Sequence, residues 1–211
     1  MLIFDRVSLK HRLEGMPSRS RVVFALTCAE GLMPLYNAFS ERNANSSWSY
    51  LRSIADDLWE QLIGKTVTPN HEFLDKYPNL APNDDWPVSE FTMLNPLAEN
   101  AVLALGSASE CHVSEDGECA VLAAEQAFEA VDYLAQNADD LDYCEIGGEE
   151  AILISDVVQK ELKRQIDALA LLEITLEQDS EYIGVINSLR EQSIESGAKL
   201  RRVAETLVKT E

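Results

Sequence analysis

The chain has 211 residues, of which 46% are hydrophobic and 26% charged, a composition typical of a globular domain with its own core. This composition excludes a disulfide-stabilised miniprotein, a collagen-like chain and a wholly disordered chain. The formal net charge of −20 argues against general binding to nucleic acid, which needs a basic surface, and against docking on anionic lipid.

Helical spacing of apolar residues predicts three helices in the first third of the chain. Val7, Leu9 and Leu13 indicate a short first helix. A second helix is expected over 20–42, and its run VVFALTCAEGLMPLYNAF is apolar almost all round, as in a buried central helix. A third is expected over 47–64, where Gly64 is a stop signal.

Two proline signals predict the next helices. Thr68-Pro69 is typical of an N-cap followed by a first-turn proline, and starts a short helix to about Tyr77. The region from Pro78 to Pro96 contains four prolines, so residues 78–95 are expected to form a long irregular connection. Asn95-Pro96 repeats the start signal and predicts a helix to about Cys111.

The second half of the chain predicts three longer helices, over 118–137, from Glu149 to about Gln178, and over 181–208. An acidic loop is expected at 138–148. The helix from Glu149 has the strongest apolar periodicity, at Val158, Leu162, Ile166, Leu169, Leu172 and Leu176. No segment has a convincing strand pattern. We therefore expect a single all-α domain over 1–211, a bundle of about seven or eight helices.

Pro34 predicts a kink in the buried second helix, because proline has no N–H to donate to the carbonyl of Glu30. Such a kink would open a small polar pocket lined by Thr27, Glu30, Tyr36 and Asn37. A buried carboxylate needs a basic partner, for instance Arg52. Glu30 is therefore either a structural carboxylate at the kink or part of a ligand pocket.

The acidic charge is concentrated in the middle of the chain. Between Lys76 and Lys160 lie 83 residues without Lys or Arg, and they carry 18 carboxylates. Like charges repel, and no base within this segment offsets them. The segment is either a solvated face that keeps the protein soluble or a surface that binds a basic protein partner. The densest part comprises Asp139, Asp140, Asp142, Glu145, Glu149 and Glu150.

Motifs for catalysis and metal binding have little support. None of the three histidines follows a Glu by three residues, as di-iron bundles require. Cys111, His112, Cys119 and Cys144 do not have zinc-site spacing, and the phosphate-loop, dinucleotide and nucleophile-elbow motifs do not occur. We expect a protein without cofactor or metal, leaning toward a non-enzymatic interaction protein. An enzyme or small-molecule binder using Glu30 and Tyr36, and a homodimer formed by the C-terminal helices, stay open as alternatives.

The N-terminal sequence MLIFDRVSLKHRLEGM does not have the pattern of a signal peptide. The most apolar stretch, Val22 to Ala29, is shorter than the roughly 20 residues that span a bilayer. No two cysteines form a C-x-x-C pair, and Cys28 is expected to be a small core residue. These features predict a cytoplasmic protein with reduced thiols and no membrane association.

The segment FALTCAEGLMPLYNAFSER, followed by YLRSIADDLWEQLIG, resembles the YjaG-like family, a bacterial domain of unknown function. The shared pattern is Cys-x-Glu, then Pro-x-Tyr-x-x-Phe, then a helix ending near Leu-Trp-Glu. The C-terminal end departs from the family, with Ser196-Gly197-Ala198-Lys199 in place of a Ser-Asn-Ile-Gly segment. The resemblance implies an all-α cytoplasmic bacterial protein and implies no activity or catalytic residue. The residues that carry it are Cys28, Glu30, Pro34, Tyr36, Phe39, Leu58, Trp59 and Glu60.

Overall fold

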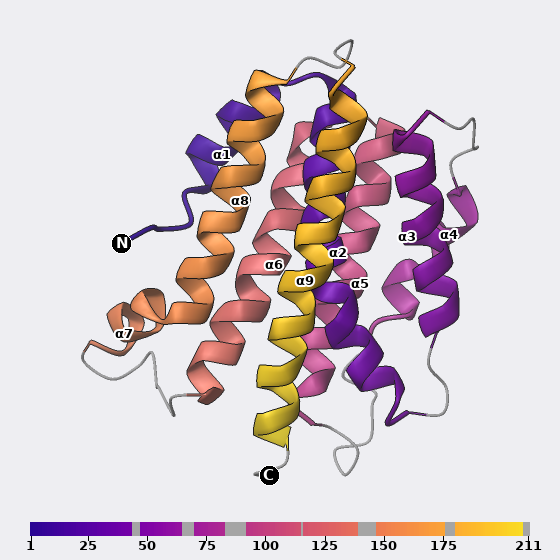
Figure 1. Cartoon of the computed structure of the whole chain (residues 1–211). Coiled ribbons are helices and arrows are strands. Elements are labelled where there is room, and N and C mark those ends of the chain that lie inside the picture. The colour runs from indigo at the N-terminus through magenta and orange to yellow at the C-terminus, as the bar shows by residue number, and fades with distance from the viewer. Residues whose placement is uncertain are drawn as a thin grey trace.

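A computed structural model describes residues 1–43, 47–64, 70–82, 92–114, 116–138, 147–175 and 180–208. In these residues the chain forms nine α-helices and one short 3-10 helix, without a strand, so the predicted all-α single domain is confirmed (Figure 1). The helices are α1 (Arg6–Glu14), α2 (Ser18–Ser40), α3 (Trp48–Leu62), α4 (His71–Lys76), α5 (Leu94–Ser114), α6 (Gly117–Ala138), α7 (Gly148–Ile154), α8 (Asp156–Ile174) and α9 (Tyr182–Val208), with η1 at Tyr77–Asn79.

Helix α2 is the centre of the bundle, as its apolar sequence predicts. It contacts α3, α5, α6, α8 and α9, and Figure 1 shows it among these helices. By length and composition α2 as a whole could cross a membrane, which the short stretch Val22 to Ala29 did not suggest. However, 89% of its most apolar window is buried inside the bundle, as in the core helix of a globular domain.

Helices α2 and α9 approach each other closely at a glycine. A Cβ added to Gly197 on α9 would lie 2.5 Å from the carbonyl oxygen of Gly31 and 2.9 Å from the ring of Pro34. Only a residue without a side chain fits this approach. Helix α2 continues through Pro34 to Ser40, and the kink at Pro34 stays a prediction.

The prediction of one helix from Glu149 to about Gln178 is wrong, because Ser155 interrupts it with an extended backbone at φ −57° and ψ 144°. The side chain of Gln159 stabilises this interruption of the helix. Its amide nitrogen donates to the carbonyl of Leu153 over 2.7 Å, which supplies a partner that a continuous helix would have given. Gln159 also bonds the backbone N–H and carbonyl of Leu2, at 2.8 and 2.9 Å.

The predicted core stripe of α8 is also partly wrong. Ile166 is 38% exposed, whereas Glu161 and Gln165 are buried on the inner face. Leu176 lies outside the described residues. The charged residue Glu161 of α8 therefore faces the core of the bundle.

Several predicted helix ends shift by a few residues. Helix α4 is capped by Asn70, whose side chain accepts from the N–H of Phe73, while Thr68 and Pro69 lie outside the described residues. Helix α5 begins at Leu94, one residue before Asn95, and runs to Ser114. Gly64 has φ +102°, which confirms the predicted stop after α3.

Candidate functional site

Glu30 lies in the core of the bundle and is fully paired. Its carboxylate accepts two hydrogen bonds from Arg52 on α3, at 2.6 and 2.9 Å, and one from the indole nitrogen of Trp59 at 2.7 Å. Trp59 is fully buried, and the guanidinium of Arg190 on α9 stacks over its ring at 5.7 Å. The predicted pairing of Glu30 with Arg52 is confirmed, and this cluster joins α2, α3 and α9.

The other residues of the predicted pocket face different partners. Thr27 donates to the carbonyl of Val23, and the buried Tyr36 hydroxyl accepts from the N–H of Ser47 at 3.2 Å. Asn37 donates to Glu41 one turn further along α2. These contacts satisfy the polar atoms locally, and the grooves described below are lined by none of the four residues.

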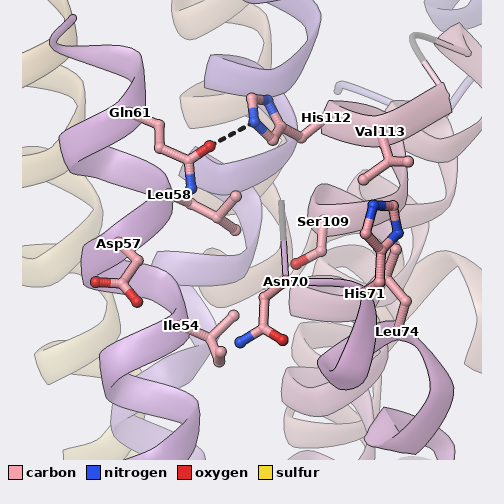
Figure 2. A pocket seen from close by; sticks show the side chains of 10 residues that line it. All are labelled: Ile54, Asp57, Leu58, Gln61, Asn70, His71, Leu74, Ser109, His112 and Val113. Carbon is pink, nitrogen blue, oxygen red and sulfur yellow. Dashed lines mark hydrogen bonds between the residues drawn. The ribbon is translucent and has the colours of Figure 1, made fainter. Parts of the chain in front are cut away.

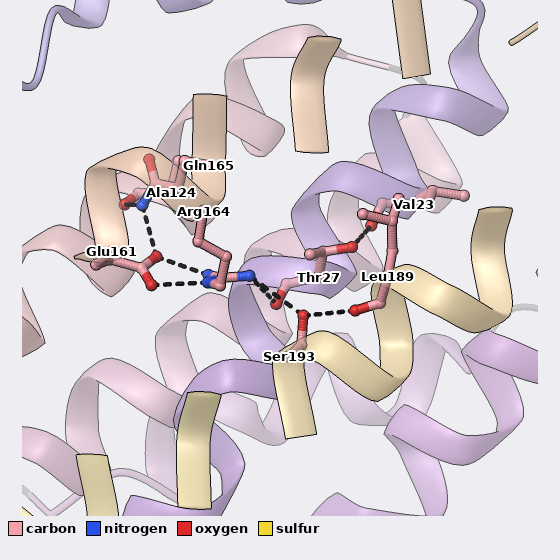
Figure 3. Close-up of polar contacts among 8 residues, drawn as sticks. All are labelled: Val23, Thr27, Ala124, Glu161, Arg164, Gln165, Leu189 and Ser193. Carbon is pink, nitrogen blue, oxygen red and sulfur yellow. Dashed lines mark hydrogen bonds and ion pairs between the residues drawn. The ribbon is translucent and has the colours of Figure 1, made fainter. Parts of the chain in front are cut away.

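A second buried charge cluster lies where α2, α6, α8 and α9 meet (Figure 3). Arg164 forms a two-point contact with Glu161, at 2.7 and 2.6 Å. The other end of its guanidinium donates to the carbonyl of Thr27 at 3.1 Å and to the hydroxyl of Ser193 at 3.2 Å. Gln165 donates to Glu161 at 2.9 Å and to the carbonyl of Ala124.

Both ions of this pair are withdrawn from solvent, since the side chains of Arg164 and Glu161 are 11% and 3% exposed. Burial lowers the pKa of Arg164, but the Glu161 carboxylate more than offsets this and leaves that pKa raised. The apolar spacing of α8 does not predict this cluster. An Arg three residues after a Glu is common on exposed helix surfaces, so this spacing does not indicate a buried ion pair. The one sequence feature that indicates burial is the position of Glu161 beside the apolar stripe of α8.

Cys28 and Cys111 have the properties of core residues, since both are fully buried. Burial raises the pKa of Cys28 to about 12 and that of Cys111 to about 12, so neither is prepared to act as a nucleophile near neutral pH. Within the described ranges, no three His, Cys, Asp or Glu side chains are grouped as metal ligands. Cys144 lies outside those ranges.

A groove of about 340 Å³ lies between α3, α4 and α5 (Figure 2). We name it the α3–α5 groove. Apolar side chains from all three helices line it, together with polar groups at its rim. The imidazole Nε2 of His112 lies 2.6 Å from the amide oxygen of Gln61, so this contact bridges α5 and α3. The full lining is Ile54, Asp57, Leu58, Gln61, Asn70, His71, Leu74, Ser109, His112 and Val113.

A second groove, about 370 Å³ in volume, lies between α6 and α7, and we name it the α6–α7 groove. Asp132 on α6 and Glu149 on α7 contribute one carboxylate each. Gln136 donates to Asp132 at 2.7 Å. No ion pair joins Asp132 or Glu149 to a base in the part of the chain that the structure describes. The remaining lining is Phe128, Ile152 and Leu153.

Further carboxylates lie close to Asp132 on α6 and on the neighbouring helix α5. Burial raises the pKa of Asp132, and the charge of Glu149 raises it further, against the Gln136 hydrogen bond. Loss of solvent and repulsion by Glu125 raise the pKa of Glu129, and Asp132 and Glu99 add to that effect. We name these four residues the acidic face: Glu99, Glu129, Asp132 and Glu149.

Some acids of the middle segment are neutralised by the N-terminal helix. Glu118 pairs with Arg6 at 2.5 Å and with Lys10 at 2.9 Å, and Glu125 lies 3.7 Å from Arg6. The predicted partner-binding residues Glu149 and Glu150 are in the first turn of α7. The other four, Asp139, Asp140, Asp142 and Glu145, lie outside the described residues.

The fold and these sites define an all-α bundle with paired charges in its core and, at its surface, the α3–α5 and α6–α7 grooves, which combine apolar and polar side chains. The chain belongs to the DUF416 family, described as a protein of unknown function, whose family model matches residues 8–199. The fold is similar to the crystal structure of a DUF416 family protein from Shewanella baltica OS155, with a TM-score of 0.74 and 19% identity. That alignment covers 89% of this chain and 93% of the other. No curated protein sequence gave a significant match.

Proposed function

We propose that this DUF416 protein is a non-enzymatic interaction protein whose acidic face binds a basic protein partner. The observation that carries the proposal is the α6–α7 groove, where Asp132 and Glu149 converge from two helices without a base beside them in the described chain. The raised pKa of Asp132 supports this proposal, because a carboxylate whose ionised form is disfavoured by burial and by Glu149 would be stabilised by a bound cation.

The groove suits a long basic side chain. Its apolar residues Phe128, Ile152 and Leu153 offer a surface for the methylene stem of Lys or Arg, and the two carboxylates receive the charged head. Complementary charge acts mainly on the association rate and on the choice of partner. Binding should therefore weaken steeply as the salt concentration rises.

A fluorescent arginine-rich peptide tests the proposal, with the same peptide carrying citrulline as the neutral comparison. We expect salt-sensitive binding to the arginine peptide, weakened about tenfold by the double variant Asp132→Asn/Glu149→Gln. The control Asp167→Asn/Glu191→Gln removes the same net charge from α8 and α9 and should leave affinity within about twofold.

An equal loss of peptide affinity in the two double variants would show that only the net charge of the protein matters, and would overturn the proposal. A third variant, with Asp139, Asp140 and Asp142 changed to Asn, measures what the acidic segment before α7 adds. We expect it to weaken binding further, because these residues precede Glu149 in the same charge block.

A ligand pocket at Glu30 and Tyr36 is less favoured, because Glu30 already accepts from Arg52 and Trp59 and so has little capacity left for a ligand. A homodimer through the C-terminal helices stays a prediction, which light scattering at several concentrations would test. Within the family we further propose a YjaG-like, cytoplasmic bacterial member. The shared residue pattern supports the YjaG-like assignment, and the hydrogen bond from Trp59 to Glu30 joins the two halves of that pattern.

A further inference from the structure

We propose that the α3–α5 groove binds a small organic amine with an apolar or aromatic body. This site is separate from the acidic face, since Asp57 lies on α3 and precedes the segment without Lys or Arg between Lys76 and Lys160. The proposal thus does not depend on the proposed protein partner. The volume of the α3–α5 groove, about 340 Å³, falls in the range of natural small-molecule pockets, roughly 300–1,000 Å³.

The apolar residues of the groove face one another across it. Figure 2 shows Ile54 and Leu58 extending from α3, with Leu74 and Val113 on the opposite side. Val113 is 38% exposed and Leu74 is half-buried, so these two residues present apolar surface of the groove to solvent. A ligand body placed between Leu58 and Leu74 would remove this surface from water.

The polar residues of the rim are held in place before any ligand arrives. Gln61 is fixed by His112, Asn70 by its cap to the N–H of Phe73, and Ser109 by donation to the carbonyl of Leu105 at 2.9 Å. Side chains that are already ordered lose little entropy on binding, so a small ligand is bound at lower cost.

Charge selects the ligand class. Asp57 is a carboxylate at the edge of the groove, and it has no ion-pair partner within the described chain. The neighbouring Asp56 differs in this respect, because Arg52 and Arg190 both bind it. Among the described lining residues there is no Lys or Arg, and the charge of Asp57 would repel an anionic ligand. An ammonium group is attracted to it.

Binding of 2-phenylethylamine, followed by protein NMR titration, tests the proposal against 3-phenylpropionate, an anion of similar shape. We expect the amine to bind at least about fivefold more tightly than the anion, a ratio that one exposed ion pair can supply. The amide signals that shift should include those of Leu58, Leu74 and Val113.

Asp57→Asn should abolish this preference for the amine. The matched control is Asp75→Asn, an exposed acid on α4 beside Leu74 that does not line the groove, and it should bind like the parent protein. The proposal would be overturned if amine and anion bound equally well, or if both variants lost the preference for the amine to the same extent. It would also be overturned if the amine shifted no amide signals. Because the test uses no basic peptide, its failure is distinguishable from failure of the acidic-face proposal.

Discussion

The indole nitrogen of Trp59 on α3 donates a hydrogen bond of 2.7 Å to the carboxylate of Glu30 on α2. Arg52, two turns earlier on α3, holds the same carboxylate at two points. The resulting cluster connects the central helix to its neighbour through a charge that is 2% exposed. A buried charge with this many partners is a structural element, and its removal has a measurable cost in stability.

Glu30→Gln should lower the free energy of unfolding by about 3 kcal/mol, because it leaves the Arg52 guanidinium without its charge partner. Urea denaturation followed by circular dichroism measures this value. Glu191→Gln, an exposed acid on α9, serves as the control and should change stability by less than about 0.5 kcal/mol. A loss of that small size for Glu30→Gln would contradict the structural role.

Arg164→Met should destabilise the protein by about 3–5 kcal/mol, since it leaves the Glu161 carboxylate buried without a base. The double variant Glu161→Leu/Arg164→Met should recover most of that loss, because it removes both ions and replaces them with apolar side chains. A double variant as unstable as Arg164→Met would show that the packing, rather than the unpaired charge, dominates.

Gly197→Ala should destabilise the protein by about 1–3 kcal/mol, because the new Cβ would collide with the backbone of Gly31. Gly184→Ala, on the same helix, has no atom within 4 Å of the new Cβ. This control should gain up to about 1 kcal/mol from helix propensity. Thermal unfolding of the two variants provides the comparison, and changes of the same sign in both would contradict the close α2–α9 contact.

Asp132→Asn should raise the free energy of unfolding at pH 7 by about 0.5 kcal/mol, a small gain because Asp132 is only half-buried. The pKa of Asp132 is raised above its ordinary value of 3.8, so its ionisation disfavours the folded state. This cost is complete above the raised pKa and disappears as the pH falls toward 3.8. The gain from Asp132→Asn should therefore shrink at low pH, whereas a gain independent of pH would contradict the assignment.

The helices could be predicted because the 3.6-residue spacing of apolar side chains is a local property of the sequence. The partnership of Glu30 and Arg52 could also be predicted, since a carboxylate inside so apolar a helix needs a base. The break at Ser155 could not, because Gln159 holds it through the carbonyl of Leu153 and the distant backbone of Leu2.

The remaining differences also depend on contacts between distant helices. The buried position of Glu161 is stabilised through Arg164, whose other partners are Thr27 on α2 and Ser193 on α9. The spacing of apolar residues within α8 cannot reveal those partners, so it predicts that Ile166 is buried and does not predict that Glu161 is. The α3–α5 groove likewise forms from three helices and has no signature in any one of them.

The most direct test of the acidic face is to map where a basic partner binds. A ¹⁵N-labelled protein titrated with the arginine-rich peptide at low salt reports the binding surface through its backbone amide signals. We predict shifts concentrated on α6 and α7, including those of Asp132 and Glu149, which are reversed by added salt. Shifts spread evenly over exposed acids such as Asp75, Asp167 and Glu191, or none on α6 and α7, would contradict the proposal.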